Sequence, residues 1–141
     1  MQAARNARLC QHGGYAVVRA DIRRLPLRPR FDIVVSNPPF YPPAWGRQSA
    51  EPATARATHA LHGDIADFTR AAAAALAPHG QVVFVYDAGH LPALLLALAA
   101  AGLAVRRLRF LDDDRGKPSR VLAHAHRGGG LVSERVPYPA P

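Results

Sequence analysis

The stretch Phe31-Asp32-Ile33-Val34-Val35-Ser36-Asn37-Pro38-Pro39-Phe40 joins an apolar run directly to a turn rich in proline. An almost uninterrupted apolar run of six residues is typical of a parallel strand that is covered on both faces. In an open α/β sheet, the carboxyl end of such a strand opens into the ligand crevice. The two prolines remove two backbone N–H donors and keep the chain extended there. We therefore expect Asn37 and the carbonyl groups beside it to face a ligand.

This turn suits one chemical task, the activation of an amino nitrogen on a planar ring. An exocyclic adenine amine is a poor nucleophile because its lone pair is delocalised into the ring. If the side-chain oxygen of Asn37 and a backbone carbonyl near Pro38 each accept one N–H, the lone pair becomes available to an incoming methyl group. Positioning and preorganised dipoles then provide the catalysis, and no strong base is needed. Phe40 would hold the unpaired base by stacking.

Helix and strand patterns alternate on both sides of this strand. The pattern predicts a helix over 2–10, strands over 15–18 and 31–36, a helix from Asp64 to about 76, a strand over 81–86, a helix over 91–101, and strands over 103–111 and 121–125. Asp64 is expected to cap the second helix, and Pro78 with Gly80 to end it. This order predicts a single α/β domain over residues 1–141 whose sheet ends in an antiparallel strand pair.

The segment Asn37-Pro38-Pro39-Phe40 resembles the Asn-Pro-Pro-aromatic signature of class I S-adenosylmethionine-dependent methyltransferases. These enzymes act on planar amino or amide nitrogens. Ala20-Asp21-Ile22 lies upstream at about the separation that this family places between its third and fourth motifs. The resemblance implies S-adenosylmethionine as cofactor, with Asp21 accepting a hydrogen bond from its adenine amino group. It also places the Ile22 backbone near the cofactor, and Asn37 between cofactor and substrate.

Three downstream segments look like the branch of this family that methylates N6 of an adenine in valine tRNA. They are Arg56 with His59, Asp67-Phe68, and Lys117-Pro118-Ser119-Arg120-Val121-Leu122. This resemblance implies a tRNA substrate and a Rossmann-like sheet. The catalytic candidates are then Asn37, Pro38 and Phe40, and the candidates for binding the substrate are Phe40, Tyr41, Arg56, Lys117 and Arg120.

The sequence departs from the family at its beginning. The glycine-rich first motif and the acidic residue that grips the cofactor ribose have no counterpart, and Gln2 to Cys10 matches the family helix that follows that acid. We therefore expect an N-terminally truncated sheet without its first two strands. The strand at 15–18 would lose its neighbour and the strand at 31–36 would gain an exposed edge. This predicts poor cofactor binding by the chain alone.

The amino-acid composition indicates which kinds of partner to expect. The formal net charge is +8, and Lys117 is the only lysine, so arginine carries nearly all the positive charge. Arginine suits phosphate and base recognition, although an arginine-rich composition alone would explain the charge equally well. Cys10 is the only cysteine, and the histidines have no metal-ligand spacing. We expect a soluble, cytoplasmic, monomeric protein that binds RNA, without a metal or a membrane span.

Two alternatives stay open at this point. The same amide-and-carbonyl arrangement would serve an N5-glutamine methyltransferase that acts on a protein. Phe40 in place of tyrosine, the segment 117–122 and the basic charge favour nucleic acid over that protein substrate. The other alternative is a non-catalytic remnant, or a gene model started at the wrong methionine.

Overall fold

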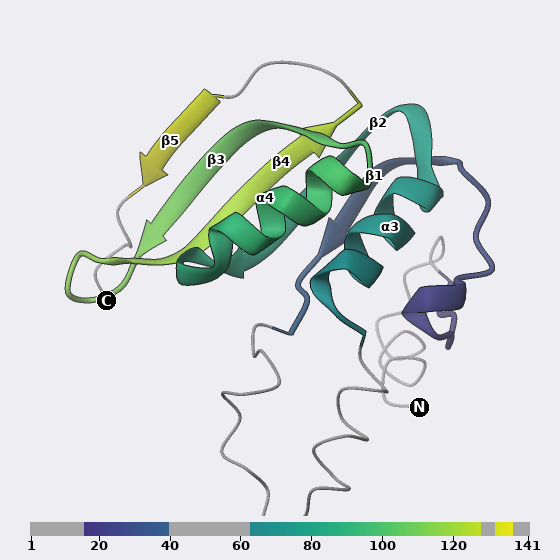
Figure 1. The fold of residues 1–141 in the computed structure, drawn as a ribbon, viewed down its shortest axis with the longest axis horizontal. Helices are drawn as coiled ribbons and strands as arrows, with labels where there is room; N and C mark the ends of the chain where they lie inside the picture. Colours follow the sequence, from purple (N-terminus) through teal and green to yellow (C-terminus); the bar gives the residue numbers. More distant parts are fainter. Residues whose placement is uncertain (1–15, 40–62, 128–131, 137–141) are drawn as a thin grey trace, which may run out of the picture.

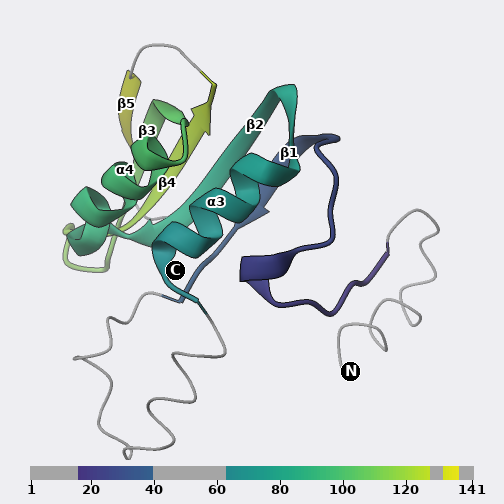
Figure 2. The same ribbon diagram turned by 45° about the vertical axis from the view of Figure 1, so that its right-hand side comes forward.

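The computed structural model describes residues 16–39, 63–127 and 132–136. These residues form a five-stranded sheet in the order β1-β2-β4-β3-β5, and two α-helices lie on the same face of it (Figures 1 and 2). The elements are η1 (Ile22–Arg24), β1 (Phe31–Ser36), α3 (Ile65–Ala75), β2 (Leu76–Asp87), η2 (Ala88–His90), α4 (Leu91–Ala100), β3 (Ala104–Asp112), β4 (Pro118–His126) and β5 (Val132–Val136). No helix in these ranges is long and apolar enough to cross a membrane.

The sheet is mixed, as expected for this α/β class. β1 runs parallel to β2, with Ser36 opposite Phe84. β4 lies between β2 and β3 and is antiparallel to both, and β5 adds to β3 in parallel. The predicted antiparallel pair at the end of the sheet is therefore confirmed as β3 and β4. β5 was not expected from the sequence, which placed its last strand at 121–125.

The core lies between the sheet and its two helices. Every second residue of the central strands is buried, including Val82 and Phe84 on β2 and Val121 and Ala123 on β4. Leu94, from α4, packs into the same cluster. Each fully buried Val, Leu or Phe side chain contributes about 1.5–3 kcal/mol to folding. The strand alternation therefore fixes which face of the sheet receives the helices.

Helix α3 begins where its sequence indicates. The Asp64 side chain accepts a hydrogen bond from Asp67 N at 2.8 Å, and the Asp67 side chain accepts one from Asp64 N at 3.1 Å. This reciprocal pair is a capping box, which satisfies two backbone donors that a helix start would otherwise leave free. The predicted cap at Asp64 is confirmed.

The start of β2 differs from the prediction. The helix ends at Ala75, and β2 begins at once, so Pro78 and Gly80 lie within the strand and do not end the helix. The pairing with β1 shifts between Phe31 and Ile33, which accommodates extra residues on β2. A Cβ atom on Gly80 would lie 2.6 Å from the Phe31 carbonyl oxygen. Only glycine allows the two backbones to approach this closely.

The N-terminal part of the described chain also differs from the prediction. Residues 16–18 form no strand, and Val17 and Val18 are exposed. A strand needs a partner for its backbone groups, and this segment has none in the described sheet. The helix predicted over 2–10 lies outside the described residues. The exposed edge predicted for 31–36 is confirmed within the described sheet, because β1 is an outer strand of it.

Candidate active site at the carboxyl end of β1

Asn37 follows β1 directly and is exposed, whereas the next residue, Pro38, is fully buried. The buried proline ring anchors the backbone beside an exposed amide side chain. Proline also fixes its own φ angle and restricts the residue before it to an extended conformation. The turn therefore presents the Asn37 amide from a rigid position at the carboxyl edge of the sheet.

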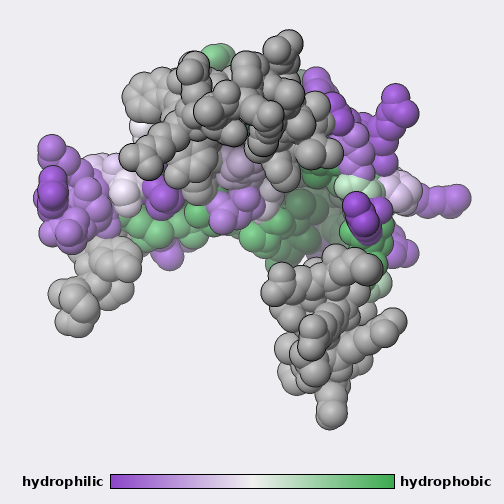
Figure 3. Space-filling model, turned by 90° about the horizontal axis from the view of Figure 1, so that it is seen from below, coloured by the Kyte–Doolittle hydropathy of each residue, from purple (hydrophilic) through white to green (hydrophobic). Residues whose placement is uncertain are grey.

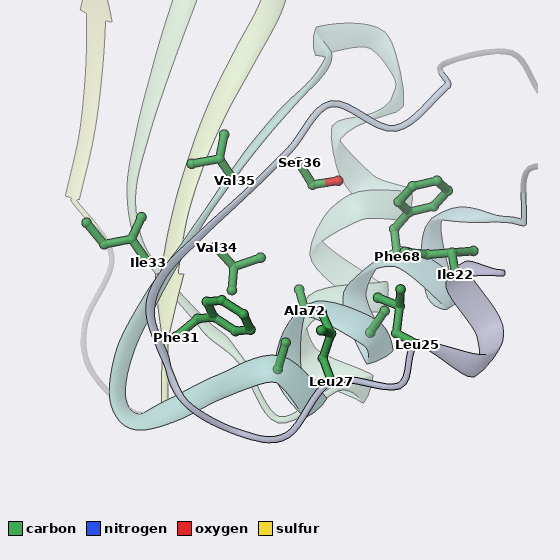
Figure 4. A pocket seen from close by; sticks show the side chains of 12 residues that line it. Ile22, Leu25, Leu27, Phe31, Ile33, Val34, Val35, Ser36, Phe68 and Ala72 are labelled. Atoms are coloured by element: carbon green, nitrogen blue, oxygen red, sulfur yellow. The ribbon is translucent and has the colours of Figure 1, made fainter. Parts of the chain in front are cut away.

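An apolar cavity of about 280 Å³ lies next to this turn (Figure 4). Its walls come from β1, from α3, and from the segment that includes η1. The lining residues are Ile22, Leu25, Leu27, Phe31, Ile33, Val34, Val35, Ser36, Phe68, Ala71, Ala72 and Ala75. Figure 4 shows Phe31 and Val34 pointing towards Leu27 and Ala72, while Ile33 and Val35 extend to the other side of the strand.

The cavity connects the two segments that the sequence singled out. Ile22 lines it from η1 and Ser36 lines it from the last position of β1. These residues are the immediate chain neighbours of Asp21 and Asn37. The structure therefore brings the Asp21-Ile22 and Ser36-Asn37 segments to one cavity, although Ile22 and Ser36 are 14 positions apart in the chain.

The Asp21 side chain already accepts hydrogen bonds from Arg23. Its side chain caps η1 by accepting a hydrogen bond from Arg23 N at 3.0 Å. The Arg23 guanidinium adds contacts of 2.9 and 2.7 Å from Nε and Nη2. The hydrogen bonds from this side chain, and then the one from its backbone, lower the pKa of Asp21 to about 2. Asp21 is thus a fully ionised acceptor, occupied by Arg23 in this structure.

A polar cluster lies at the carboxyl end of β2, the strand next to β1. Asp87 Oδ1 accepts a hydrogen bond from Gly89 N at 2.9 Å and lies 3.0 Å from His90 Nδ1. Arg120 Nη1 contacts Asp87 Oδ2 at 3.4 Å and donates to Ser119 O at 2.9 Å. Burial, together with the charges of Asp87 and Asp64, raises the pKa of Tyr86. This Asp87 cluster therefore orients Arg120, one of the predicted substrate-binding residues.

Comparison with known proteins identifies the fold. No model of a known protein family and no curated protein sequence matches the chain. A predicted O-methyltransferase from Agrobacterium tumefaciens superposes with a TM-score of 0.54 at 17% identity, over 84% of this chain and 50% of that chain. A TehB-like S-adenosylmethionine-dependent methyltransferase from Corynebacterium glutamicum superposes with a TM-score of 0.50 at 16% identity, over 79% of this chain and 55% of that chain. This is a methyltransferase fold.

The chain spans about half the length of these solved methyltransferases. At such low identities the similarity concerns the fold alone. Asn37 follows β1 and Asp87 is the last residue of β2, the parallel strand next to it, so both lie at the carboxyl edge of the sheet. That edge is where open α/β sheets bind their ligands.

The remaining candidate residues lie outside the lining of the apolar cavity or outside the described residues. Lys117 is exposed in the turn before β4, where its backbone N–H donates to Asp113 Oδ1 at 2.9 Å. Phe40, Tyr41 and Arg56 lie outside the described residues. Within the described ranges, no group of three His, Cys, Asp or Glu side chains could hold a metal ion.

Asp87 and His90 were missed at the sequence level. The signal that could have found them is the rule that selected Asn37, because Asp87 also ends an apolar run that forms a buried strand. The contact between Asp87 and Arg120 joins residues 33 positions apart, so no local pattern reveals it.

Proposed function

We propose that this chain carries the substrate side of an S-adenosylmethionine-dependent N6-adenine methyltransferase that acts on RNA, with tRNA as its substrate. The observation that carries the proposal is the position of Asn37. Its side chain is exposed at the carboxyl end of β1, on a backbone anchored by buried Pro38, and beside the apolar cavity.

Asn37 would act by holding the amino group that is methylated. Its side-chain oxygen accepts one N–H of the adenine amine, and a backbone carbonyl of the turn accepts the other. These two acceptors localise the nitrogen lone pair, which planar adenine otherwise draws into its ring. Because the turn is already rigid, little reorganisation is needed at the moment of reaction.

The described residues fit one part of the cofactor. S-adenosylmethionine, when bound, supplies an electrophilic methyl group. The apolar walls formed by Ile22, Val34 and Phe68 suit its flat adenine ring, and the Asp21 carboxylate lies next to Ile22 in the chain. Ser36 is the only polar side chain among the described residues that line this cavity, so no carboxylate there can grip the ribose hydroxyls. The fit therefore extends to the adenine end alone.

Two features support RNA over a protein substrate. The net charge of +8 attracts polyanions, and it is carried almost entirely by arginine. Arg120 is held at the carboxyl edge of the sheet by Asp87, with its side chain 44% exposed, and Lys117 lies exposed in the turn just before β4. Both side chains therefore place positive charge at the surface, which favours contact with backbone phosphates.

The test offers two substrates side by side. The chain is incubated with millimolar S-adenosylmethionine carrying a labelled methyl group, unmodified tRNA, and a release-factor-like protein. We expect N6-methyladenosine in the tRNA, measured by mass spectrometry of its nucleosides. The Asn37→Ala variant should lose about 10²–10³-fold in rate, the usual effect of removing one preorganised polar group.

Its control is Asp32→Ala, which removes another exposed polar side chain of the same segment and should leave the rate unchanged. Methylation of the protein alone would support the N5-glutamine alternative. No methylation of either substrate would support a non-catalytic chain.

A further inference from the structure

A second cavity lies away from Asn37, at the beginning of β2. It has a volume of about 170 Å³ and is lined by Pro78, His79, Gly80, Gln81, Arg106, His126 and Arg127. These residues come from the start of β2, the end of β4 with the residue after it, and the start of β3. The volume corresponds to roughly five or six molecules of liquid water, which is enough for a tetrahedral anion.

This cavity is separate from the candidate active site. Gln81 pairs with His126 at the cavity, whereas Asn37 follows Ser36, which pairs with Phe84. The cavity residues His79 to Gln81 are therefore four to six strand positions from the level of Asn37, or about 13–20 Å at 3.3 Å per residue. The proposed methyl transfer assigns no role to this end of the sheet.

The lining is cationic. Arg106 and Arg127 carry permanent positive charges, and no carboxylate belongs to the described lining. Arg127 Nη2 donates to Ala73 O, in the last turn of α3, at 3.0 Å, and this bond fixes its guanidinium while leaving other N–H donors available. The register of β3 and β4 shifts between Val105 and Arg107, so Arg106 lies at an irregularity that can redirect its side chain.

Hydrogen-bonding capacity remains unused around this cavity. Gln81 Oε1 lies 2.8 Å from His124 Nε2, which leaves the Gln81 amide nitrogen with its two donors. His126 Nε2 is buried and has no hydrogen-bond partner among the described residues. Burial, and then the charges of His126, Arg106 and Arg107, lower the pKa of His124. The end of the sheet is thus an environment that disfavours further positive charge and favours an anion.

We propose that this cavity binds a phosphate group, supplied either by a nucleic-acid backbone or as free phosphate. Arginine guanidinium groups bind phosphate oxygens through paired, charge-assisted hydrogen bonds, and two such groups line this cavity. A distance of about 13–20 Å corresponds to roughly four to six nucleotides of a helical strand at 3.4 Å each. One RNA molecule can therefore reach both this cavity and Asn37.

The first test uses inorganic phosphate as the probe. The full chain is titrated with phosphate in a calorimeter, together with its Arg106→Gln and Arg28→Gln variants. Arg106 lines the cavity, whereas Arg28 is exposed in the loop before β1, so the second variant removes an equal charge elsewhere. We expect about tenfold weaker phosphate binding in Arg106→Gln alone, as for loss of a hydrogen bond to a charged group. Thermal melts check that both variants remain folded.

The second test distinguishes the two sources of phosphate. Binding of unmodified tRNA is measured by fluorescence anisotropy over a range of salt concentrations. If the backbone supplies the phosphate, Arg106→Gln should reduce the slope of log affinity against log salt by about one. If Arg106→Gln weakens phosphate binding but leaves tRNA binding unchanged, the cavity takes free phosphate. Equal phosphate affinities of wild type and Arg106→Gln, or equal losses in both variants, would overturn the proposal.

Discussion

At the residue scale, the proposed contact between Asp21 and the adenine of a cofactor depends on Arg23, which occupies the Asp21 carboxylate. The two carboxylate oxygens accept four contacts from Arg23, which is about the number of lone-pair sites that a carboxylate offers. An adenine amino group must therefore displace the guanidinium. We expect Arg23→Gln to bind adenosine more tightly than wild type, and Asp21→Asn to bind it more weakly, in a calorimetric titration.

The matched control is Arg24→Gln, which removes the neighbouring exposed arginine but no hydrogen bond to the Asp21 side chain. Unchanged adenosine affinity in Arg23→Gln would show that Asp21 does not contact the ligand.

We expect His124 to make the stability of the fold depend on pH. Its pKa in the folded state is lowered by burial and by positive neighbours, so protonation is harder in the folded than in the unfolded chain. The free energy of unfolding should therefore fall as the pH drops below about 6.5, the ordinary histidine value. His124→Gln should reduce this loss, measured by urea unfolding at pH 7.5 and 5. His79→Gln, at an exposed position, is the control, and an unchanged slope in His124→Gln would contradict the expectation.

At the scale of elements, the close approach of β1 and β2 depends on Gly80. An added Cβ would meet the Phe31 carbonyl oxygen at 2.6 Å and the Leu76 side chain at 2.8 Å. Gly80→Ala should therefore lower the free energy of unfolding by about 1–3 kcal/mol, the usual cost of overpacking, in a urea titration. In the control, Gly89→Ala, the added atom meets only the Asp87 side chain at 3.1 Å. A Gly80→Ala variant as stable as wild type would contradict this close contact.

The elements differ in how well local sequence predicts them. β1 and α3 could be predicted because an apolar run and a capping aspartate are local signals. The early start of β2 could not be predicted, because Pro78 and Gly80 are also turn residues and the pairing of Leu76 with Phe31 is a tertiary contact. The segment over 16–18 has strand-forming residues but no strand beside it in the described sheet.

The parts of the candidate site also differ in how well local sequence predicts them. The position of Asn37 followed from the strand before it, and its exposure at the sheet edge agrees with that expectation. The contact between Asp87 and Arg120 joins distant segments of the chain. The phosphate-sized cavity likewise depends on the register that puts Gln81 opposite His126. Neither can be derived from spacing along the chain.

At the scale of the whole molecule, hydrophobic surface remains exposed. Ile33 and Val35 of the outer strand β1 are more than half exposed, and the view from below shows hydrophobic surface among the described residues (Figure 3). The apolar cavity also offers only Ser36 as a polar side chain in its described lining. Under the proposed function this cavity would take one part of S-adenosylmethionine, and its described lining has no groups that match the ribose and amino-acid parts.

We accordingly expect the chain alone to bind S-adenosylmethionine with a dissociation constant above about 1 mM, the upper end of typical Michaelis constants. Isothermal calorimetry measures this directly. Micromolar binding would contradict the expectation and would require cofactor contacts beyond the apolar cavity.

The strand order has a consequence for the route by which the chain folds. β3 and β4 are joined by the short turn at 113–117, so the entropy lost in closing their hairpin is small. β2 borders β4 and not β3, although β3 comes sooner in the chain. The antiparallel pairing of β2 with β4 therefore cannot form until β4 is in place. We therefore expect the hairpin to form first, and the parallel pairing of β1, with its larger sequence separation, to be among the slow steps that follow.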